Sequence, residues 1–361
     1  MRFLTFSMLL LGGVNAAAYD NPHANAAPQV EKRSLDQIYK AALKEGGTVT
    51  LWSGGDEKNQ QDALKTAFEK AFPGMTLNVT VNLSKYHDGN IDQQLANKNV
   101  YVDSIVLQTL HDFPRWKKEG ALLNYAPAGF DKIYPDFKDD DAAYYGYLGF
   151  GWQLIWNYDK LKGKKIQEFT DFLRPEFKGK LALTYPNDDD AILFAFELII
   201  KKYGNKWFED LLKQKPRWVR GTVTPSSLIA DPKSPYIASF TSVVGLGQPP
   251  SPFNFAFPKQ GQHMTWAQTA AILKDAPHPE GAKLLHNFLL TKEFQKESGF
   301  WSVRSDVPAP SGQPKFVDLP GSNPLAFRDF MLDRPKVERL RFWFEDRLGT
   351  AQGPSPLIDD L

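Results

Sequence analysis

The chain contains no cysteine among its 361 residues. This absence excludes disulfides, thiolate metal sites, thiol nucleophiles and lipid-modified cysteine anchors. An excess of one charge is also missing, because 43 basic and 42 acidic residues leave a formal net charge of +1. No surface for nucleic acid is therefore expected. The apolar runs fall short of the roughly 20 residues of a membrane-spanning helix, so no span is expected either.

What the chain has in plenty is aromatic side chains, with 26 phenylalanines and nine tryptophans. A hydrophobic content of 42% and a charged content of 24% are ordinary for a globular protein. Stability is therefore expected from packing. The length suits two domains.

The N-terminus predicts secretion. Residues 1–18 have the charged, apolar and small-residue layout of a cleavable signal peptide. Residues 19–33 end in Lys32-Arg33 and resemble the propeptides that secreted fungal proteins lose, although a flexible tail with a surface charge pair is the alternative. The acceptor tripeptides at Asn78 and Asn82 predict glycosylation along this route.

Strand and helix signals alternate along most of the chain, which predicts an α/β fold with parallel strands covered by helices. Ser34 and Gln37 predict a helix with a capping box at its start. The expected strands are 48–53, 77–81, 104–107, 149–157, 180–185, 237–241 and 264–274; the main expected helices begin near residues 61, 114, 191, 279 and 335.

The first strand ends in Ser53-Gly54-Gly55-Asp56 and leads into a helix that carries Leu64 and Phe68. A strand that opens a helix through a glycine turn leaves free backbone N–H groups at the sheet edge. This junction is the first predicted ligand site, and it favours a small polar or anionic guest.

Several blocks in a fixed order resemble the extracellular solute-binding proteins of the type II periplasmic-binding-protein fold, in the iron(III)-type branch. They include 34–54, 156–161, 177–181, 270–280, 288–295 and 303–308. The resemblance implies two α/β lobes around a ligand cleft: lobe 1 from 34–147, lobe 2 from 148–262, and a second part of lobe 1 with C-terminal helices from 263–361.

The resemblance also places ligand contacts on both lobes. The predicted contacts are Ser53, Gly54, Gly55, Asp56, Gln108 and Thr109 from lobe 1, Asn187, Asp188, Asp189, Asp190, Thr224, Ser226, Ser239 and Thr241 from lobe 2, and Tyr147, Trp152 and Trp266 near the crossings. Each has a structural alternative: the three aspartates suit a helix start, Ser226 suits a cap, and the tryptophans suit core packing.

Iron binders of this branch use adjacent tyrosines from lobe 2, whereas the adjacent pair here, Tyr144-Tyr145, precedes the crossing strand. His87, His111 and His263 show no metal-ligand spacing either. We therefore predict no metal or other cofactor, and a secreted monomer that closes on a small molecule by hinge motion. The alternatives are a secreted interaction protein that reuses the fold, and an enzyme, for which no catalytic motif is visible.

Overall fold

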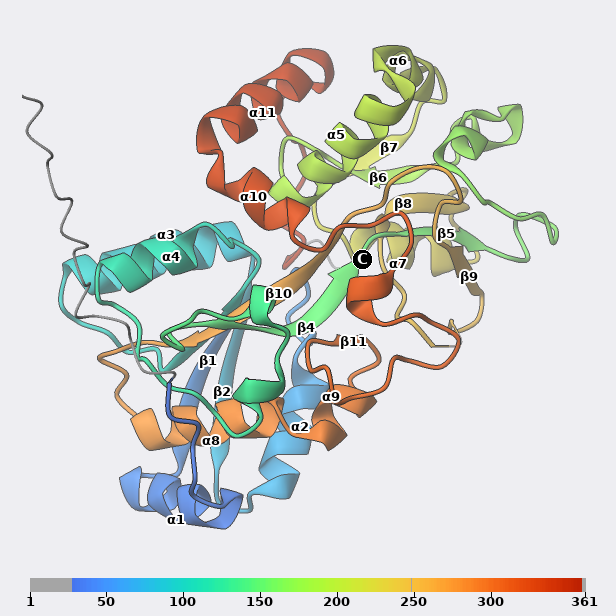
Figure 1. The fold of residues 1–361 in the computed structure, drawn as a ribbon. Helices are drawn as coiled ribbons and strands as arrows, with labels where there is room; N and C mark the ends of the chain where they lie inside the picture. Colours follow the sequence, from blue (N-terminus) through green and yellow to red (C-terminus); the bar gives the residue numbers. More distant parts are fainter. Residues whose placement is uncertain (1–27, 248, 359–361) are drawn as a thin grey trace, which may run out of the picture.

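The computed structural model describes residues 28–247 and 249–358, which form two α/β lobes joined by crossing strands (Figure 1). The predicted signal peptide and most of the predicted propeptide lie outside these residues. Within them, no helix combines the length and the apolar character needed to cross a bilayer.

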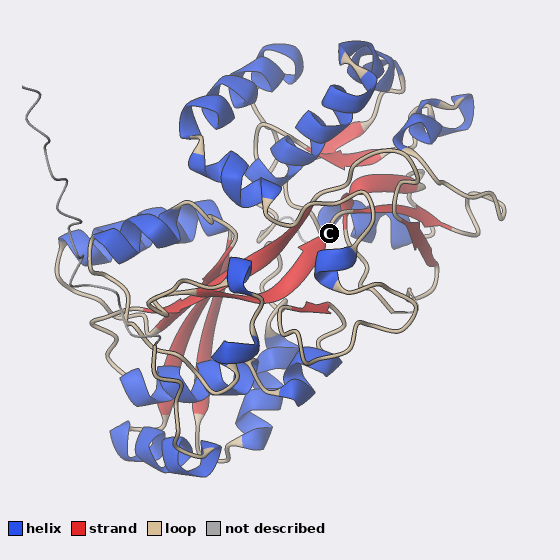
Figure 2. Ribbon diagram, in the orientation of Figure 1, coloured by secondary structure: helices blue, strands red, loops and turns tan. Residues whose placement is uncertain are grey.

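Lobe 1 is built on a mixed six-stranded sheet (Figure 2). Its order is β11 (Trp301–Ser302), β4 (Tyr145–Gly151), β10 (Thr265–Ile272), β3 (Ser104–Leu107), β1 (Thr48–Gly54) and β2 (Thr76–Asn82). The strands β2, β1 and β3 run parallel, and β10 pairs antiparallel with both β3 and β4. The returning chain thus adds β10 and β11 to the sheet of the first lobe.

Helices cover both faces of this sheet. One face carries α1 (Leu35–Glu45), α2 (Asp62–Ala71), α8 (Pro279–Leu289) and α9 (Lys292–Glu297), and the other carries α3 (Ser84–Ala96) and α4 (Asp112–Lys118). The first face buries Ile38, Phe68 and Leu284, and the second buries Ile91 and Trp116. The predicted capping box is present, because Ser34 and Gln37 exchange hydrogen bonds at the start of α1.

Lobe 2 is smaller and more aromatic. It contains the sheet β8 (Ala238–Ser242), β5 (Gln153–Asn157), β9 (Phe253–Ala256), the pair β6 (Ala182–Thr184) and β7 (Arg217–Val219), and the helices α5 (Asp190–Tyr203), α6 (Asn205–Lys213) and α7 (Thr224–Ala230). Short 3-10 helices occur at Phe130–Lys132, Pro135–Phe137, Phe169–Leu173, Pro175–Phe177 and Phe316–Asp318.

The C-terminal helices α10 (Ala326–Leu332) and α11 (Arg334–Leu348) belong to the core of lobe 2. Phe327 and Phe330 contact the ring of Phe194 on α5, and Phe344 packs edge-on against Phe196. Within the predicted range 263–361, these aromatic contacts hold the C-terminal helices to the second lobe.

The crossing between the lobes is where the expected strand 149–157 divides. β4 ends at Gly151 in the sheet of lobe 1, and β5 begins at Gln153 in the sheet of lobe 2. Trp152, between them, donates its backbone N–H to Met264 O at 3.1 Å, which ties the two crossing segments together. Gly149 is required here, since a Cβ would lie 2.7 Å from the ring of Phe316.

Residues 28–33 of the expected propeptide pack onto lobe 1. Arg33 lies 2.7 Å from Glu31 and 2.6 Å from Glu280, and Tyr125 donates to Glu31 at 2.9 Å. The hydrogen bonds from Arg33 lower the pKa of Glu31 to about 2 against the opposing effect of burial. Cleavage after Arg33 stays a prediction, and it requires this segment to leave its partners.

Candidate functional site

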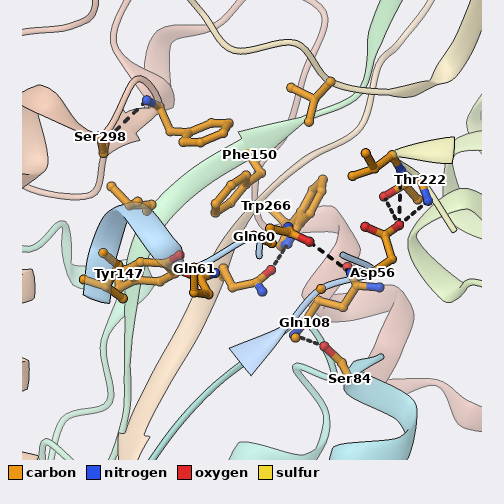
Figure 3. A pocket seen from close by; sticks show the side chains of 18 of the residues that line it. Asp56, Gln60, Gln61, Ser84, Gln108, Tyr147, Phe150, Thr222, Trp266 and Ser298 are labelled. Carbon is orange, nitrogen blue, oxygen red and sulfur yellow. Dashed lines mark hydrogen bonds between the residues drawn. The ribbon is translucent and has the colours of Figure 1, made fainter. Parts of the chain in front are cut away.

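A pocket of about 900 Å³ lies between the lobes and beside the crossing strands (Figure 3). Most of the predicted ligand residues line it. They are Gly54, Gly55, Asp56, Gln108, Thr109, Tyr147, Trp152, Asp188, Asp189, Asp190 and Trp266. Both lobes therefore contribute polar groups to one cavity.

The other predicted ligand residues do not line this pocket. Ser239, Thr241 and Thr184 form a buried hydrogen-bonded chain that reaches Gly221 O at 2.6 Å and so supports a pocket-lining turn from below. Ser226 lies inside α7 and donates to Val223 O at 2.7 Å; it does not cap this helix, whose N-cap is Val223. Ligand contact stays a prediction for the residues that do not line this pocket, which are Ser53, Asn187, Thr224, Ser226, Ser239 and Thr241.

Asp56 makes a buried contact between the lobes, which we term the inner contact. It follows β1 of lobe 1, and its carboxylate accepts from Thr222 N, from Thr222 Oγ1 at 3.0 Å and from Val223 N at 3.2 Å, all in lobe 2. Gln60, in the turn before α2, accepts from Asp56 N at 3.0 Å and fixes the junction. Burial raises the pKa of Asp56 against the effect of these hydrogen bonds.

Asp188 makes a second contact between the lobes at the rim of the pocket. Its carboxylate lies 2.7 Å from Lys85 Nζ on α3 of lobe 1 and 2.9 Å from Arg220 Nε of lobe 2. Arg220 also reaches Tyr86 OH at 3.0 Å. Burial works to raise the pKa of Asp188, but Arg220 and Lys85 together hold it below its usual value.

Asp189 and Asp190 begin α5 and differ in their partners. Asp189 caps the helix by accepting from Ala191 N at 2.8 Å, and its other oxygen accepts from Gln108 Nε2 of lobe 1 at 3.0 Å. Desolvation raises the pKa of Asp189 to about 6. Asp190 lies 2.8 Å from Arg341 and 3.0 Å from Arg334, whose charges lower its pKa in spite of burial.

Aromatic rings form the wall beside the crossing strands. The rings of Trp152 and Trp266 lie 5.0 Å apart at 48°, and Phe150 stacks on Trp266 at 5.7 Å and 29°. The indole N–H of Trp266 donates to Gln268 Oε1 at 3.2 Å. The two tryptophans thus pack against neighbouring rings and also line the pocket, and their contact with a ligand stays a prediction.

The sequence does not predict several of the residues that line the pocket. Ser84 and Lys85 lie on α3, a helix that the periodicity does not reveal, and Thr222 and Val223 lie in a turn without a motif. Ser84 could have been predicted from its place as a serine at the start of a helix. Its hydroxyl accepts from Gln108 N at 3.1 Å. Arg341 belongs to α11, far along the chain, and no local pattern connects it with the cleft.

The potential metal ligands lie apart from one another. Among residues 28–247 and 249–358, no group of three or more histidines, aspartates and glutamates could hold a metal ion. Tyr145 of the adjacent tyrosine pair is buried in lobe 1, where its hydroxyl lies 2.8 Å from His286 Nδ1. This tyrosine pair therefore does not face the cleft.

Glycosylation at the two acceptor sites stays a prediction. Asn78 is exposed on β2, an edge strand of the sheet, whereas Asn82 is partly buried at the end of the same strand.

Comparison with known proteins gives a consistent picture. A family model described as bacterial extracellular solute-binding protein matches residues 63–320. The spermidine/putrescine-binding periplasmic protein of Escherichia coli (strain K12) is 25% identical over 241 residues, which cover 60% of this chain and 63% of that protein. A spermidine/putrescine-binding periplasmic protein 1 of Haemophilus influenzae is 26% identical over 162 residues, covering 39% of this chain and 41% of that protein. The chain thus spans less than two thirds of the length of these relatives.

Solved structures share the architecture. The substrate binding protein of an ABC transporter from Agrobacterium tumefaciens superposes with a TM-score of 0.70 at 12% identity, covering 83% of this chain and 94% of that one. The fructose-6-phosphate-bound periplasmic binding protein of Actinobacillus pleuropneumoniae gives 0.61 at 18%, covering 85% and 100%. Iron-bound HitA of Pseudomonas aeruginosa gives 0.61 at 17%, covering 82% and 99%. These likenesses show the two-lobed fold that the sequence predicts.

Proposed function

Because the chain belongs to the family of bacterial extracellular solute-binding proteins, we propose that it captures a small organic cation of the amine class between its lobes. The prediction that it is a binding protein and not an enzyme is confirmed by this membership. The class of ligand is a further step, which rests on the charges and rings of the pocket.

The observation that carries this step is the pairing of the charged groups. Lys85 and Arg341 line the pocket, but each is held by a carboxylate, Asp188 or Asp190. Asp56 and Asp189, in contrast, accept hydrogen bonds from neutral donors. Next to these aspartates, an anion would have to break an ion pair to find a positive partner, whereas a cation finds two buried carboxyls that lack one. Lys70 also lines the pocket, but it is an exposed residue in the last turn of α2.

The raised pKa values of two buried aspartates also favour a cationic ligand. A carboxylate that loses water without gaining a positive partner is destabilised, which is why burial raises the pKa of Asp56 and of Asp189. An ammonium group placed between them would supply the missing charge. The rings of Trp152 and Trp266 add surfaces that attract cations. Relatives named for binding spermidine and putrescine agree with this chemistry.

Capture by closure follows from the position of these groups. Asp56 lies on lobe 1 and Asp189 on lobe 2, so a ligand that contacts both is bound more tightly by the closed form than by an open one. Such a difference in affinity is what shifts a hinge equilibrium.

Calorimetry with spermidine tests the proposal, with fructose 6-phosphate as the anionic control. We expect spermidine to bind and to release protons below about pH 6.5, because the positive charge lowers the pKa of Asp189. Titrations in two buffers of different ionisation enthalpy measure this release. Binding of the sugar phosphate instead of spermidine, or proton uptake on binding, would overturn the amine assignment.

We further propose that the chain reaches the extracellular space as a monomer, through a signal peptide at 1–18 and removal of 19–33. The extracellular character of the family supports this route. Mass spectrometry of the secreted protein is expected to find Ser34 as the first residue and glycans on Asn78 and Asn82; an intact N-terminus starting before residue 19 would contradict it.

A further inference from the structure

The last part of the described chain returns to the mouth of the pocket. After α11, the backbone C=O of Gly349 accepts from Asn187 Nδ2 at 3.0 Å, next to the aspartates that begin α5. The following segment, residues 349–358, which we term the C-terminal strap, then reaches the turn at Gly221. The family match ends before it, at residue 320.

Three separate parts of the chain meet at Gly221. A Cβ built on this glycine would lie 2.5 Å from Pro356 Cβ of the strap and 3.1 Å from Asp56 Oδ2 of lobe 1. Pro356 is buried at this point, whereas its neighbour Ile358 is 62% exposed. Gly221 has φ of +77°, so both its backbone conformation and its crowded surroundings require a glycine.

The strap therefore packs on the turn that receives the carboxylate of Asp56. Thr222 and Val223, which follow Gly221, supply the donors for this contact between the lobes. From the other side, Thr184 Oγ1 donates to Gly221 O at 2.6 Å. The turn is held between the buried core of lobe 2 and the proline of the strap.

From this arrangement we propose that the C-terminal strap is a retention device, which holds the Gly221–Val223 turn in the position that closes the lobes and thereby slows release of the ligand. Pro356 acts as a positioning residue, since it works through the turn. A proline suits this task because its fixed φ limits the conformations that the strap must give up on packing.

The first test needs no ligand. In the full chain, we expect the amides of Thr222 and Val223 to be protected from hydrogen exchange by their bonds to Asp56. In a chain shortened after Thr350, and in the Pro356→Ser variant, exchange of a peptide covering 218–224 should become at least several-fold faster, while the peptide covering Ala191 and Ile192 should not change. Ile358→Ser, in the same segment but exposed, is the matched control and should behave as the full chain.

The second measurement uses spermidine and rests on the proposed function. The dissociation rate is expected to rise about tenfold in Pro356→Ser and to stay unchanged in Ile358→Ser. Unchanged exchange of 218–224 in both the shortened chain and Pro356→Ser would overturn the strap proposal, whatever spermidine does. Failure of spermidine to bind the full chain would instead overturn the amine assignment and leave the exchange test to decide on the strap.

Discussion

Two of the contacts that join the lobes are made by aspartates with different electrostatic surroundings. Asp188, at the rim, lies between Lys85 and Arg220 and keeps a lowered pKa. Asp56, inside, is 4% exposed, is held by neutral donors and has a raised pKa. The carboxylate at the rim thus has positively charged partners, whereas the inner carboxylate has only neutral donors.

The difference indicates which contact a ligand can influence. The carboxylate of the rim contact already has two positive partners, Lys85 and Arg220, so a cationic guest changes it little. The inner contact lacks a counter-charge, and a cationic guest would supply one. We therefore infer that the rim contact orients the two lobes and that the inner contact responds to the ligand.

Removal of the inner carboxylate should have the largest effect. Asp56→Ala leaves the donors of Thr222 and Val223 without their acceptor and deletes the negative charge. A charged hydrogen bond contributes about 1.5–3 kcal/mol, so spermidine affinity measured by calorimetry should fall roughly 10- to 100-fold.

Two further variants separate closure from charge at this position. Asp56→Asn keeps an acceptor but no charge, so it should restore part of the closure seen by small-angle scattering without restoring the affinity for spermidine. Asp62→Ala, on the exposed first turn of α2, is the control and should change affinity less than about twofold. Equal losses in Asp56→Ala and Asp62→Ala would contradict a special role for the inner contact.

The next largest effect is expected from a change of pH, which alters the affinity for spermidine through the ionisation of Asp189. Its pKa of about 6 lies above the usual value, so its protonated form stabilises the ligand-free fold below pH 4, and this contribution is lost as pH rises through about 6. Spermidine requires the ionised form, so its affinity should rise between pH 5 and 7.5 while the stability of the free protein falls.

Asp189→Asn provides the matched variant for that prediction, since asparagine caps a helix as well as aspartate does. Calorimetry across this pH range, with urea unfolding of the free protein, should show that the variant loses most of the slope in affinity and part of the slope in stability. The rest of the stability slope remains because burial also raises the pKa of Asp88 to about 6. Glu31, with a pKa of about 2, stays ionised throughout and contributes no slope in this window. An affinity for spermidine that falls from pH 5 to 7.5 would contradict the assignment.

The sequence could predict the parts of the cleft that depend on local order. A strand followed by a glycine turn and a helix places Gly54, Gly55 and Asp56 at the sheet edge wherever the lobes lie, and the structure finds them in the pocket. The same holds for Asp189, because a helix start fixes the position of its cap. These positions follow from neighbouring residues.

The remainder depends on contacts that neighbouring residues do not encode. The helix α3 carries Gly89 and an irregular apolar pattern, so its periodicity is too weak to predict Lys85 at the cleft. Ser239 and Thr241 lie at the expected strand but point into a hydrogen-bonded chain behind the wall. Thr222 and Arg341 reach the pocket through the packing of lobe 2, which the sequence order alone does not specify.

The smallest effect is expected at the rim. Lys85→Met removes one of the two cations beside Asp188, and Arg220 remains. The loss of binding free energy for spermidine should therefore stay below about 1 kcal/mol, which is roughly fivefold in affinity. The effect should shrink further between about 50 and 500 mM salt, because screening weakens a pair whose lysine is 38% exposed. Lys40→Met breaks an ion pair of the same 2.7 Å length on α1, remote from the cleft, and should leave binding unchanged. If Lys85→Met weakened binding as much as Asp56→Ala does, the rim would carry the response to ligand and the division of roles between the two aspartates would be wrong.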